Sequence, residues 1–303
     1  MIRIGLLDFD GHAGLFAHLL NNPEVPEAER VPGATVVAGY ADPAAAAFGE
    51  EGLKAAIANC QKWGVEMLDR PEDLLGRIDA AIVGAVNGRF HLEKARPFLK
   101  VGMPVFIDKP FANTVADARE LVRLAGQSGA PLFCSSSVRC AKAVREVLEG
   151  REQFGAVLGM SACGPTIPLG GAYPMHGLQF YGVHTIELVN QMMGGGVNWV
   201  SSVTAGERNI LTLGWADGRM ASLLLGSAHH SPGENAHSFI AWCEKDIAVR
   251  YAQPDGHYLI RQIIQFFRDG KAPVSPDQSL EVVAIIEAAM ASEARSGARV
   301  MLS

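Results

Sequence analysis

Residues 1–137 alternate between short apolar runs and stretches with helical spacing, and this alternation limits the fold more than any other feature. Strands that are apolar along nearly their whole length, joined through helices, are typical of a parallel sheet covered on both faces. We therefore predict a doubly wound α/β domain. Its six strands are expected at Ile2–Leu7, Ala34–Tyr40, Val65–Leu68, Ala80–Ala85, Pro104–Ile107 and Pro131–Cys134. Its helices are expected at Pro43–Trp63, His91–Val101 and Val115–Ser128.

The pattern changes after residue 137, where strand-like runs follow one another. The pair Asp217-Gly218 is a hairpin turn signal between two of them, which favours antiparallel pairing. We therefore predict two domains, residues 1–137 and 138–303, the second with a large, mainly antiparallel sheet. Its strands are expected at Val157–Cys163, Trp199–Ala205, Asn209–Trp215, Met220–Gly226, Phe239–Cys243 and Ile247–Tyr251. Its helices are expected at Leu178–Met193, His257–Asp269 and Gln278–Arg295.

The composition excludes several classes of protein. Apolar residues make up 49% and charged residues 19% of the chain, as in an ordinary soluble globular protein. The formal charge of -6, without any basic block, argues against nucleic acid as a partner. No apolar run approaches the ~20 residues of a membrane span. A strand that begins at Ile2 leaves no room for a signal peptide, so we expect a cytoplasmic protein.

The cysteines lie far apart, and no Cys-x-x-Cys pair is present. In a cytoplasmic protein they are expected to be buried, reduced thiols rather than disulfides or metal ligands. They are Cys60, Cys134, Cys140, Cys163 and Cys243.

The turn after the first strand, Asp8-Phe9-Asp10-Gly11, admits a phosphatase interpretation. A strand that ends in Asp-Phe-Asp-Gly is the first motif of the haloacid-dehalogenase group, where the first Asp attacks phosphorus. That chemistry also needs a magnesium site completed by a later acidic motif, and the chain contains no Gly-Asp dipeptide. Ser135 and Lys109, the candidate phosphate contacts, come in the wrong order for that group. The phosphatase interpretation is therefore disfavoured.

The same turn also fits a dinucleotide-binding loop, because a helix follows directly from about His12. Aligned on the strand end, the three glycine positions of Gly-x-Gly-x-x-Gly hold Asp8, Asp10 and Ala13. A carboxylate ~4–5 Å from a phosphate costs ~3–4 kcal/mol at an effective dielectric of ~20, so Asp10 should weaken cofactor binding. Gly11 would take over the close approach if the loop shifts by one residue. On these residues alone, an ordinary strand-to-helix turn is an equal alternative.

Three further segments resemble one family. Residues 86–125 hold Asn87 and His91 after the fourth strand and Asp108-Lys109-Pro110 after the fifth. Residues 180–194 hold Gly182, His184 and Glu187 in one helix, and residues 257–302 form a similar C-terminal tail. The chain resembles the glucose–fructose oxidoreductase, inositol dehydrogenase and MocA-like (Gfo/Idh/MocA) family over essentially its whole length. The acidic first loop departs from the family's glycines.

This resemblance implies an N-terminal Rossmann domain that binds the dinucleotide and a C-terminal domain that binds substrate. The open sheet of the second domain would mediate a homodimer or homotetramer. The implied reaction is NAD(P)-dependent oxidation or reduction at a carbinol carbon of a sugar or polyol. NAD is slightly favoured, since Asp42 closes the second strand and would accept hydrogen bonds from ribose. Expected cofactor contacts are Phe9, Asp10, Gly11, His12, Ala13, Asp42, Asn87, His91, Asp108 and Lys109.

Catalysis is expected from Lys109, His184 and His176. Lys109 lies at a strand end before Pro110, and its charge would favour a developing alkoxide beside the nicotinamide. His184 lies early in a helix and suits proton transfer to or from a hydroxyl. The family usually has an Asp four residues earlier, where this chain has Phe180. His176, in the Gly/Pro-rich loop 164–177, is a candidate replacement, as are Tyr173 and Tyr181.

Other polar residues admit two roles each. Glu187 would orient His184, one turn away, or form a metal site with His176, but we expect no metal. Asp42 also fits a helix N-cap before Pro43. Arg139 is either structural or a contact for an acidic substrate group. His229-His230 is expected in a loop after a strand.

The favoured function is an NAD(P)-dependent oxidoreductase acting on a sugar-like or polyol-like molecule. One alternative keeps the fold and loses the redox step, so that Lys109, His184 and His176 act as acid and base in a lyase, hydratase or isomerase. The two loop aspartates and Phe180 favour this alternative. The other alternative is a non-catalytic ligand-binding protein.

Overall fold

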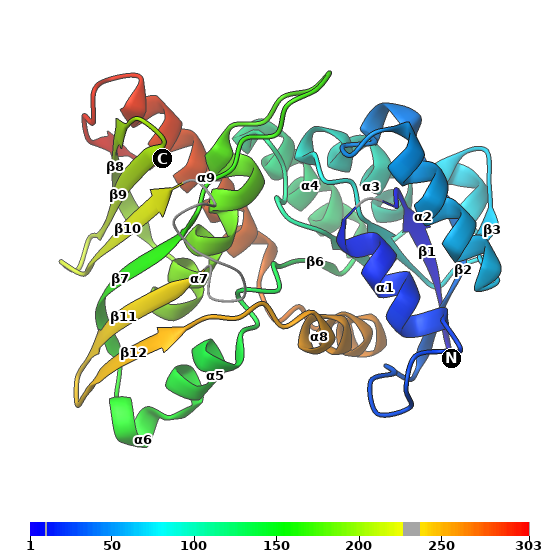
Figure 1. The fold of residues 1–303 in the computed structure, drawn as a ribbon, viewed down its shortest axis with the longest axis horizontal. Helices are drawn as coiled ribbons and strands as arrows, with labels where there is room; N and C mark the ends of the chain where they lie inside the picture. The colour runs from blue at the N-terminus through cyan, green and yellow to red at the C-terminus, as the bar shows by residue number, and fades with distance from the viewer. Residues whose placement is uncertain (10, 227–236, 303) are drawn as a thin grey trace. The chain divides into compact units, whose positions relative to one another are not determined.

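The computed structural model describes residues 1–9, 11–226 and 237–302, which form two compact units (Figure 1). The first unit contains Met1–Ser135 and His257–Leu280, and the second contains Ser136–Gly256 and Glu281–Ser303. The sequence placed residues 257–280 in the second domain, whereas in the structure they pack with the first unit. The assignment of residues 1–137 to cofactor binding and of residues 138–303 to substrate binding stays a prediction.

The first unit is built on a six-stranded parallel sheet with the order β3-β2-β1-β4-β5-β6. The order reverses at β1, which pairs with β2 on one side and β4 on the other. The loops after β1 and β4 therefore diverge to opposite faces, and such a switch point is where doubly wound sheets bind ligands. The predicted fold is confirmed. The strands are β1 (Ile2–Leu7), β2 (Ala34–Tyr40), β3 (Glu66–Met67), β4 (Ala80–Val83), β5 (Val105–Ile107) and β6 (Leu132–Cys134).

The helices of this unit follow local start and stop signals. Thr114 caps α4 by accepting a hydrogen bond from the Asp117 amide, and left-handed Gly129 ends the helix. The helix expected over 43–63 is broken, because Gly49 has φ 85° and starts a new helix after a 3₁₀ turn at Pro43–Ala45. The α-helices are α1 (His12–Asn21), α2 (Glu50–Lys62), α3 (His91–Lys100), α4 (Val115–Ser128) and α8 (Gly256–Asp269). Further 3₁₀ turns are Pro71–Leu74 and Gly88–Phe90.

A row of phenylalanine rings attaches α8 to the parallel sheet. Ring centroids of Phe16 and Phe106 lie 6.1 Å apart, those of Phe106 and Phe133 5.3 Å, and those of Phe133 and Phe266 5.4 Å. All four side chains are buried, so aromatic packing explains why α8 belongs to the first unit.

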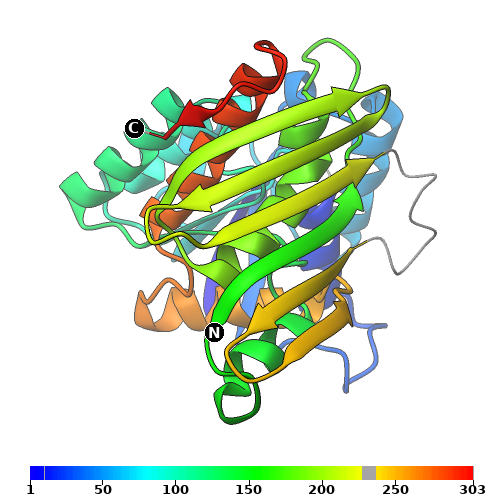
Figure 2. The same cartoon turned by 90° about the vertical axis from the view of Figure 1, so that its left-hand side faces the viewer.

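The second unit is built on a seven-stranded sheet with the order β12-β11-β7-β10-β9-β8-β13 (Figure 2). All neighbours are antiparallel except β7 and β10, which are parallel, so the mainly antiparallel sheet is confirmed. The short strand β13 was not predicted. The strands are β7 (Val157–Pro165), β8 (Val197–Ala205), β9 (Arg208–Trp215), β10 (Met220–Gly226), β11 (Ser238–Cys243), β12 (Ile247–Tyr251) and β13 (Val300–Met301).

Helices cover one face of this sheet. The predicted helix over 178–193 starts as a π-helical turn, Leu178–Gly182, and continues as α7 (Val183–Met193). The C-terminal part of α9 (Pro276–Glu293) packs into the same core. Two short helices, α5 (Lys142–Glu149) and α6 (Arg151–Phe154), were not predicted.

No helix covers the other face of this sheet in Figure 2. Several large apolar residues of its strands are exposed. Side chains alternate between the two faces of a strand, so those that do not face the helices face outward. They include Val203, Ile210, Met220, Leu224, Ile240, Trp242, Ile247, Val249 and Tyr251.

Strand alternation also corrects one expectation about the thiols. All five cysteines are free, and Cys60, Cys134 and Cys140 are buried as predicted. Cys163 is exposed, because its neighbour Ala162 faces the helices, and Cys243 is partly exposed.

In the described part of the chain, no helix is long and apolar enough to cross a membrane.

Removing the Phe266 ring tests the attachment of α8. Phe266→Ala should destabilise the protein by about 3–5 kcal/mol, since it leaves a cavity beside Phe133. Arg261→Ala, an exposed position on the same helix, should change stability by less than about 0.5 kcal/mol. Urea unfolding followed by circular dichroism measures both. Equal losses in the two variants would contradict the packing described.

Candidate functional site

Asp8 occupies the first glycine position of the loop after β1, and its carboxylate points into the protein. Its φ is 63°, a left-handed conformation that Asp tolerates better than most side chains. One carboxylate oxygen accepts a hydrogen bond from Lys94 Nζ at 2.5 Å, and the other from the Asp42 amide at 2.9 Å. Burial raises the pKa of Asp8, and the Lys94 charge opposes that shift. The charge of Asp8 is therefore paired inside the protein.

Lys94, on α3, is the partner that the sequence did not reveal. It is 4% exposed, and its ammonium also lies 3.3 Å from the second carboxylate, Asp42 Oδ2. The rings of Phe90 and Tyr40 lie 5.2 Å and 5.8 Å from the ammonium. One signal was present: helical spacing places residue 94 on the buried face of α3, with His91, Ala95 and Phe98.

Asp42 has the N-cap role that the sequence left open for it, and its role toward ribose stays a prediction. Its Oδ1 accepts a hydrogen bond from the Ala44 amide at 2.9 Å, which confirms the N-cap of the turn at Pro43. Its side chain stays 26% exposed at the end of β2, where an acid suited to ribose is expected.

The other described residues of this segment include Phe9, Gly11 and Ala13. Phe9 and Ala13 are buried, and a Cβ on Gly84 would lie 2.7 Å from the Ala13 Cβ. Only a small residue fits at the third glycine position, since α1 and β4 approach closely there. Gly11 has φ 57°, which favours glycine. Asp10 lies outside the described residues.

His12, the first residue of α1, reaches the end of β5. Its Nδ1 lies 3.2 Å and 3.1 Å from the two carboxylate oxygens of Asp108. Burial alone would raise the pKa of Asp108, but the charge and hydrogen bond of His12, with the charge of Lys109, hold it below its usual value. The predicted residues His12, Asp108 and Lys109 therefore lie together at the strand ends of the first unit.

Asn87 and His91 lie at the same strand ends. Their polar atoms contact neighbouring backbone and side-chain groups. Asn87 Oδ1 accepts hydrogen bonds from the Arg89 amide and from Asn113 Nδ2. The ring nitrogens of His91 contact the carbonyl oxygens of Ala85 and Phe111 at 2.7 Å and 3.2 Å. Burial lowers the pKa of His91. His91 thus connects the loop that contains Ala85 with the loop that contains Phe111.

In the second unit, His184 lies in α7 with its ring against two other aromatic rings. The ring centroids of Tyr181 and His237 lie 5.2 Å and 5.8 Å from that of His184. His237 Nδ1 lies 3.1 Å from Thr185 Oγ1, and burial lowers the His237 pKa to about 4. His237 directly precedes β11 and lies outside any motif, so sequence reasoning missed it. Phe180, at the family's Asp position, packs on Tyr181.

Glu187 does not orient His184, contrary to one expectation. Glu187 Oε2 accepts hydrogen bonds from the Ser136 amide at 2.7 Å and from Arg139 Nε at 3.3 Å. Both Arg139 and Glu187 are buried, and Arg139 also contacts Gln191. Arg139 is therefore structural in this unit rather than free for an acidic substrate group.

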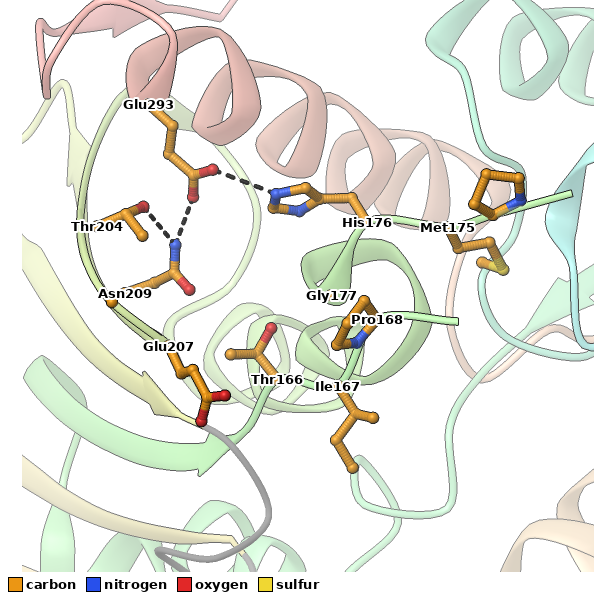
Figure 3. Close-up of a pocket in the computed structure, with 12 residues that line it drawn as sticks. Thr166, Ile167, Pro168, Met175, His176, Gly177, Thr204, Glu207, Asn209 and Glu293 are labelled. Atoms are coloured by element: carbon orange, nitrogen blue, oxygen red, sulfur yellow. Dashed lines mark hydrogen bonds and ion pairs between the residues drawn. The ribbon is translucent and has the colours of Figure 1, made fainter. Parts of the chain in front are cut away.

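His176 lines a cavity of about 730 Å³ within the second unit (Figure 3). Its Nε2 lies 3.3 Å from Glu293 Oε2, and the other Glu293 oxygen accepts hydrogen bonds from Asn209 and Ser202. Burial raises the pKa of Glu293, but the hydrogen bonds from His176 and Ser202 outweigh it and lower the pKa. Glu293, at the end of α9, was not predicted. The loop 166–177 and the β8–β9 turn form the cavity walls.

Among the residues described, no group of three or more His, Cys, Asp or Glu side chains is arranged to hold a metal ion. The expected loop residues His229 and His230 lie outside the described residues.

Comparison with sequence families gives a match over residues 28–136, to an oxidoreductase family with an NAD-binding Rossmann fold. The uncharacterized oxidoreductase YhhX of Escherichia coli is 29% identical over 125 residues, which are 37% of this chain and 35% of that protein. YceM of Salmonella typhimurium is 30% identical over 92 residues, 30% of each protein. The chain thus spans about a third of the length of these relatives.

Solved structures match the whole chain. A myo-inositol dehydrogenase from Lactobacillus casei, in complex with NAD(H) and myo-inositol, gives a TM-score of 0.79 at 15% identity, covering 100% of this chain and 97% of that one. GenD2 from gentamicin A biosynthesis, in complex with NAD, gives 0.78 at 17% identity, covering 100% and 96%. At such identities the likeness establishes the two-domain fold alone.

The lowered pKa of His237 predicts a pH dependence of stability. The ordinary value is 6.5 and the folded value about 4, so the unfolded chain binds a proton first as the pH falls. Wild-type stability should therefore fall between about pH 6.5 and pH 4, by up to about 3 kcal/mol. His237→Gln should remove that part of the loss. Urea unfolding across this range measures it, and identical slopes for both proteins would contradict the buried, neutral imidazole.

Proposed function

Through residues 28–136 the chain belongs to the Gfo/Idh/MocA oxidoreductase family, and on this premise we propose an NAD-dependent oxidoreductase acting on a sugar-like or polyol-like molecule. The observation that carries the proposal is this match to an NAD-binding Rossmann fold, on a sheet whose order reverses at β1. The inositol bound by the Lactobacillus casei neighbour supports the substrate class.

The residues of the first unit fit a dinucleotide. Gly11, Ala13 and Gly84 allow the close approach of backbone that a pyrophosphate requires. The Asp8 carboxylate, which would repel phosphate, is buried and paired with Lys94. We propose that the backbone of residues 9–13 holds the pyrophosphate, Asp42 the ribose, and the Asp108-Lys109 turn the nicotinamide end. His91 and Asn87 would act indirectly, by fixing the loops around them.

Lys109 and His184 are proposed to act on the substrate oxygen. When bound, the nicotinamide would supply the hydride acceptor or donor. The Lys109 ammonium would stabilise negative charge on the substrate oxygen, and His184 would take the proton from the hydroxyl or return it. The rings of Tyr181 and His237 pack edge to face with the His184 ring, and the low pKa of His237 keeps that neighbour neutral near pH 7. Phe180 supplies no carboxylate, so His184 would act without the family's Asp.

His176 is proposed to position the loop 166–177 through its ion pair with Glu293. Its cavity has an apolar wall and polar groups at Thr204 and Asn209, which suits a small molecule that carries hydroxyl groups (Figure 3). A catalytic role for His176 stays a prediction.

A non-redox reaction on the same fold stays the second candidate. The observation that favours it is Phe180, whose buried ring stands where the family's redox enzymes usually have Asp. In that reaction Lys109 and His184 would serve as acid and base without any dinucleotide.

The function is tested by turnover of a panel of sugars and polyols with NAD⁺. Lys109→Met and His184→Ala should each lower kcat/KM by at least ~100-fold, since each removes a group that stabilises charge or moves a proton. Lys100→Met, an exposed position at the end of α3, should leave it unchanged. Formation of reduced nicotinamide gives the rate, and circular dichroism checks the fold.

Near-normal turnover in both folded variants would show that the assigned site is wrong. Loss of turnover in a protein that needs no added or bound nicotinamide would keep the site and replace the oxidoreductase by the non-redox candidate.

We also propose that the open sheet face of the second unit pairs with a second copy of the chain. Trp242 and Val249, on neighbouring strands, are 43% and 63% exposed, and they lie on the same open face as the other exposed apolar side chains. Exposed apolar surface of this kind usually marks an interface.

Charges placed on this face should separate the copies. Trp242→Glu combined with Val249→Lys should convert a dimer or tetramer into monomer, since both charges would have to be desolvated in the interface. Lys54→Glu, on the surface of α2, should leave the oligomer intact. Light scattering at micromolar concentration measures the mass, and a monomeric wild type would contradict the proposal.

A further inference from the structure

We propose that the cavity beside the loop 166–177 is a second ligand site, which binds a small hydroxylated molecule through its protonated amine, as in an amino sugar or an amino polyol. Glu207 and Glu293 hold the amine, and Asn209 accepts a hydrogen bond from the ligand. All described residues that line this cavity belong to the second unit. The inference goes beyond the proposed function, since it needs neither the dinucleotide nor the redox step.

The cavity has the size and the walls of a small-molecule site. Its volume of about 730 Å³ lies within the ~300–1,000 Å³ that is usual for ligand pockets. The loop supplies an apolar wall, and the β8–β9 turn and the end of α9 supply polar groups (Figure 3). An apolar wall suits the carbon skeleton of an organic ligand better than a bare ion. This wall consists of Ile167, Pro168, Pro174 and Met175.

The polar part of the lining carries an excess of negative charge. Glu207 lies in the turn between β8 and β9, and Glu293 is the last residue of α9. None of the described residues in the lining is Lys or Arg, and the exposed Arg208 next to Glu207 does not line the cavity. Two carboxylates and one imidazole give a net charge of -1 when His176 is protonated and -2 when it is neutral. A cationic ligand is therefore attracted in either state.

The two carboxylates differ in their burial. Glu207 is exposed, whereas the side chain of Glu293 is 15% exposed. Glu293 Oε1 accepts hydrogen bonds from Ser202 and Asn209, while Oε2 has His176 Nε2 at 3.3 Å. Each carboxylate oxygen has two lone pairs, so Oε2 can accept one further donor. Glu293 is therefore the inner anchor for an ammonium group, and Glu207 adds attraction from the outer side.

Asn209 supplies a second, independent observation that points to a ligand. It is 6% exposed, and its amide nitrogen donates to Thr204 Oγ1 at 2.7 Å and to Glu293 Oε1 at 2.6 Å. Its amide oxygen accepts no hydrogen bond from the described residues, and Figure 3 shows this oxygen turned away from Glu293. A nearly buried acceptor in a cavity wall favours a ligand that donates hydrogen bonds, as hydroxyl and ammonium groups do.

The loop that forms the apolar wall is held in place without a ligand. His176 Nδ1 accepts a hydrogen bond from the Leu178 amide at 3.2 Å, and the His176 amide donates to Gln179 Oε1 at 3.1 Å. The two arms of the loop are joined by a backbone bridge between Leu169 and Met175. Because the wall is already formed, binding a ligand costs little ordering of the chain.

The experiment compares matched pairs of ligands that differ in one amino group. Glucosamine is compared with glucose, and glucamine (1-amino-1-deoxysorbitol) with sorbitol, by titration calorimetry at pH 7 on the whole chain without dinucleotide. In at least one pair, the amine should bind at least about tenfold more tightly than its partner, because only the amine pairs with the carboxylates.

Three variants locate the amine. Glu293→Gln keeps the size of the side chain and an oxygen for Ser202 and Asn209, and should weaken amine binding by at least about tenfold. Glu207→Gln should weaken it by about threefold, since an exposed charge is screened by water. Glu152→Gln, an exposed position on α6 in the same unit, should leave it unchanged. Circular dichroism checks that each variant folds.

Equal affinities of amine and partner in both pairs would overturn the inference. An amine preference that survives in a folded Glu293→Gln variant would place the amine elsewhere and would overturn it as well. If Glu293→Gln does not fold, Glu207→Gln decides, and unchanged amine binding there overturns the inference. Because no dinucleotide is present, these results leave the proposed function standing, and a failure of turnover with NAD⁺ leaves the amine site standing.

Discussion

The buried ion pair between Asp8 and Lys94 is the interaction on which the candidate cofactor site depends. A dinucleotide-binding loop brings backbone close to a phosphate, and a free carboxylate there would oppose binding by several kcal/mol. Pairing Asp8 with Lys94 removes this obstacle and fixes the ends of β1 and β2 and the α3 helix relative to one another. The same pairing occupies Lys94, so the more exposed acid beside it is the Asp42 carboxylate. The geometry of the loop and the charge at the end of β2 thus have one physical cause.

Much of the fold followed from periodicity in the sequence. The runs at Ile2–Leu7 and Ala34–Tyr40 and the helix at Val115–Ser128 have the bounds predicted for them, because apolar runs and caps act locally. The place of residues 257–280 did not follow, since it depends on Phe266 meeting Phe133, a contact between residues far apart in sequence. The parallel pairing of β7 with β10 is long-range in the same sense. The exposure of Cys163 depends on which face of β7 is covered.

The candidate site was predictable where a motif names its residues. Asp42, Asp108 and Lys109 follow strands and lie at strand ends in the structure, and His184 lies early in its helix. Lys94, His237 and Glu293 were missed because each acts through a partner that is distant in the chain: Asp8, His184 and His176 respectively. Glu187 was assigned a wrong partner. It lies one helical turn from His184, which suggested a contact between them, but its carboxylate accepts a hydrogen bond from Arg139 instead. A charged residue on an apolar helix face, such as Lys94, was the usable signal that a buried partner exists.

The coupling free energy between Asp8 and Lys94 tests this account most directly. Urea unfolding of wild type, Asp8→Asn, Lys94→Met and the variant with both changes completes a double-mutant cycle. Lys94→Met should cost about 3–5 kcal/mol because it leaves the buried Asp8 carboxylate without its cation. Asp8→Asn should cost less, since Lys94 keeps Asp42 as a partner, and removing both should cost less than the two single losses together. The account predicts a coupling of at least about 1.5 kcal/mol between the two residues. Losses that add within about 0.5 kcal/mol would show that the two side chains act independently, which would contradict the pairing on which the cofactor site depends.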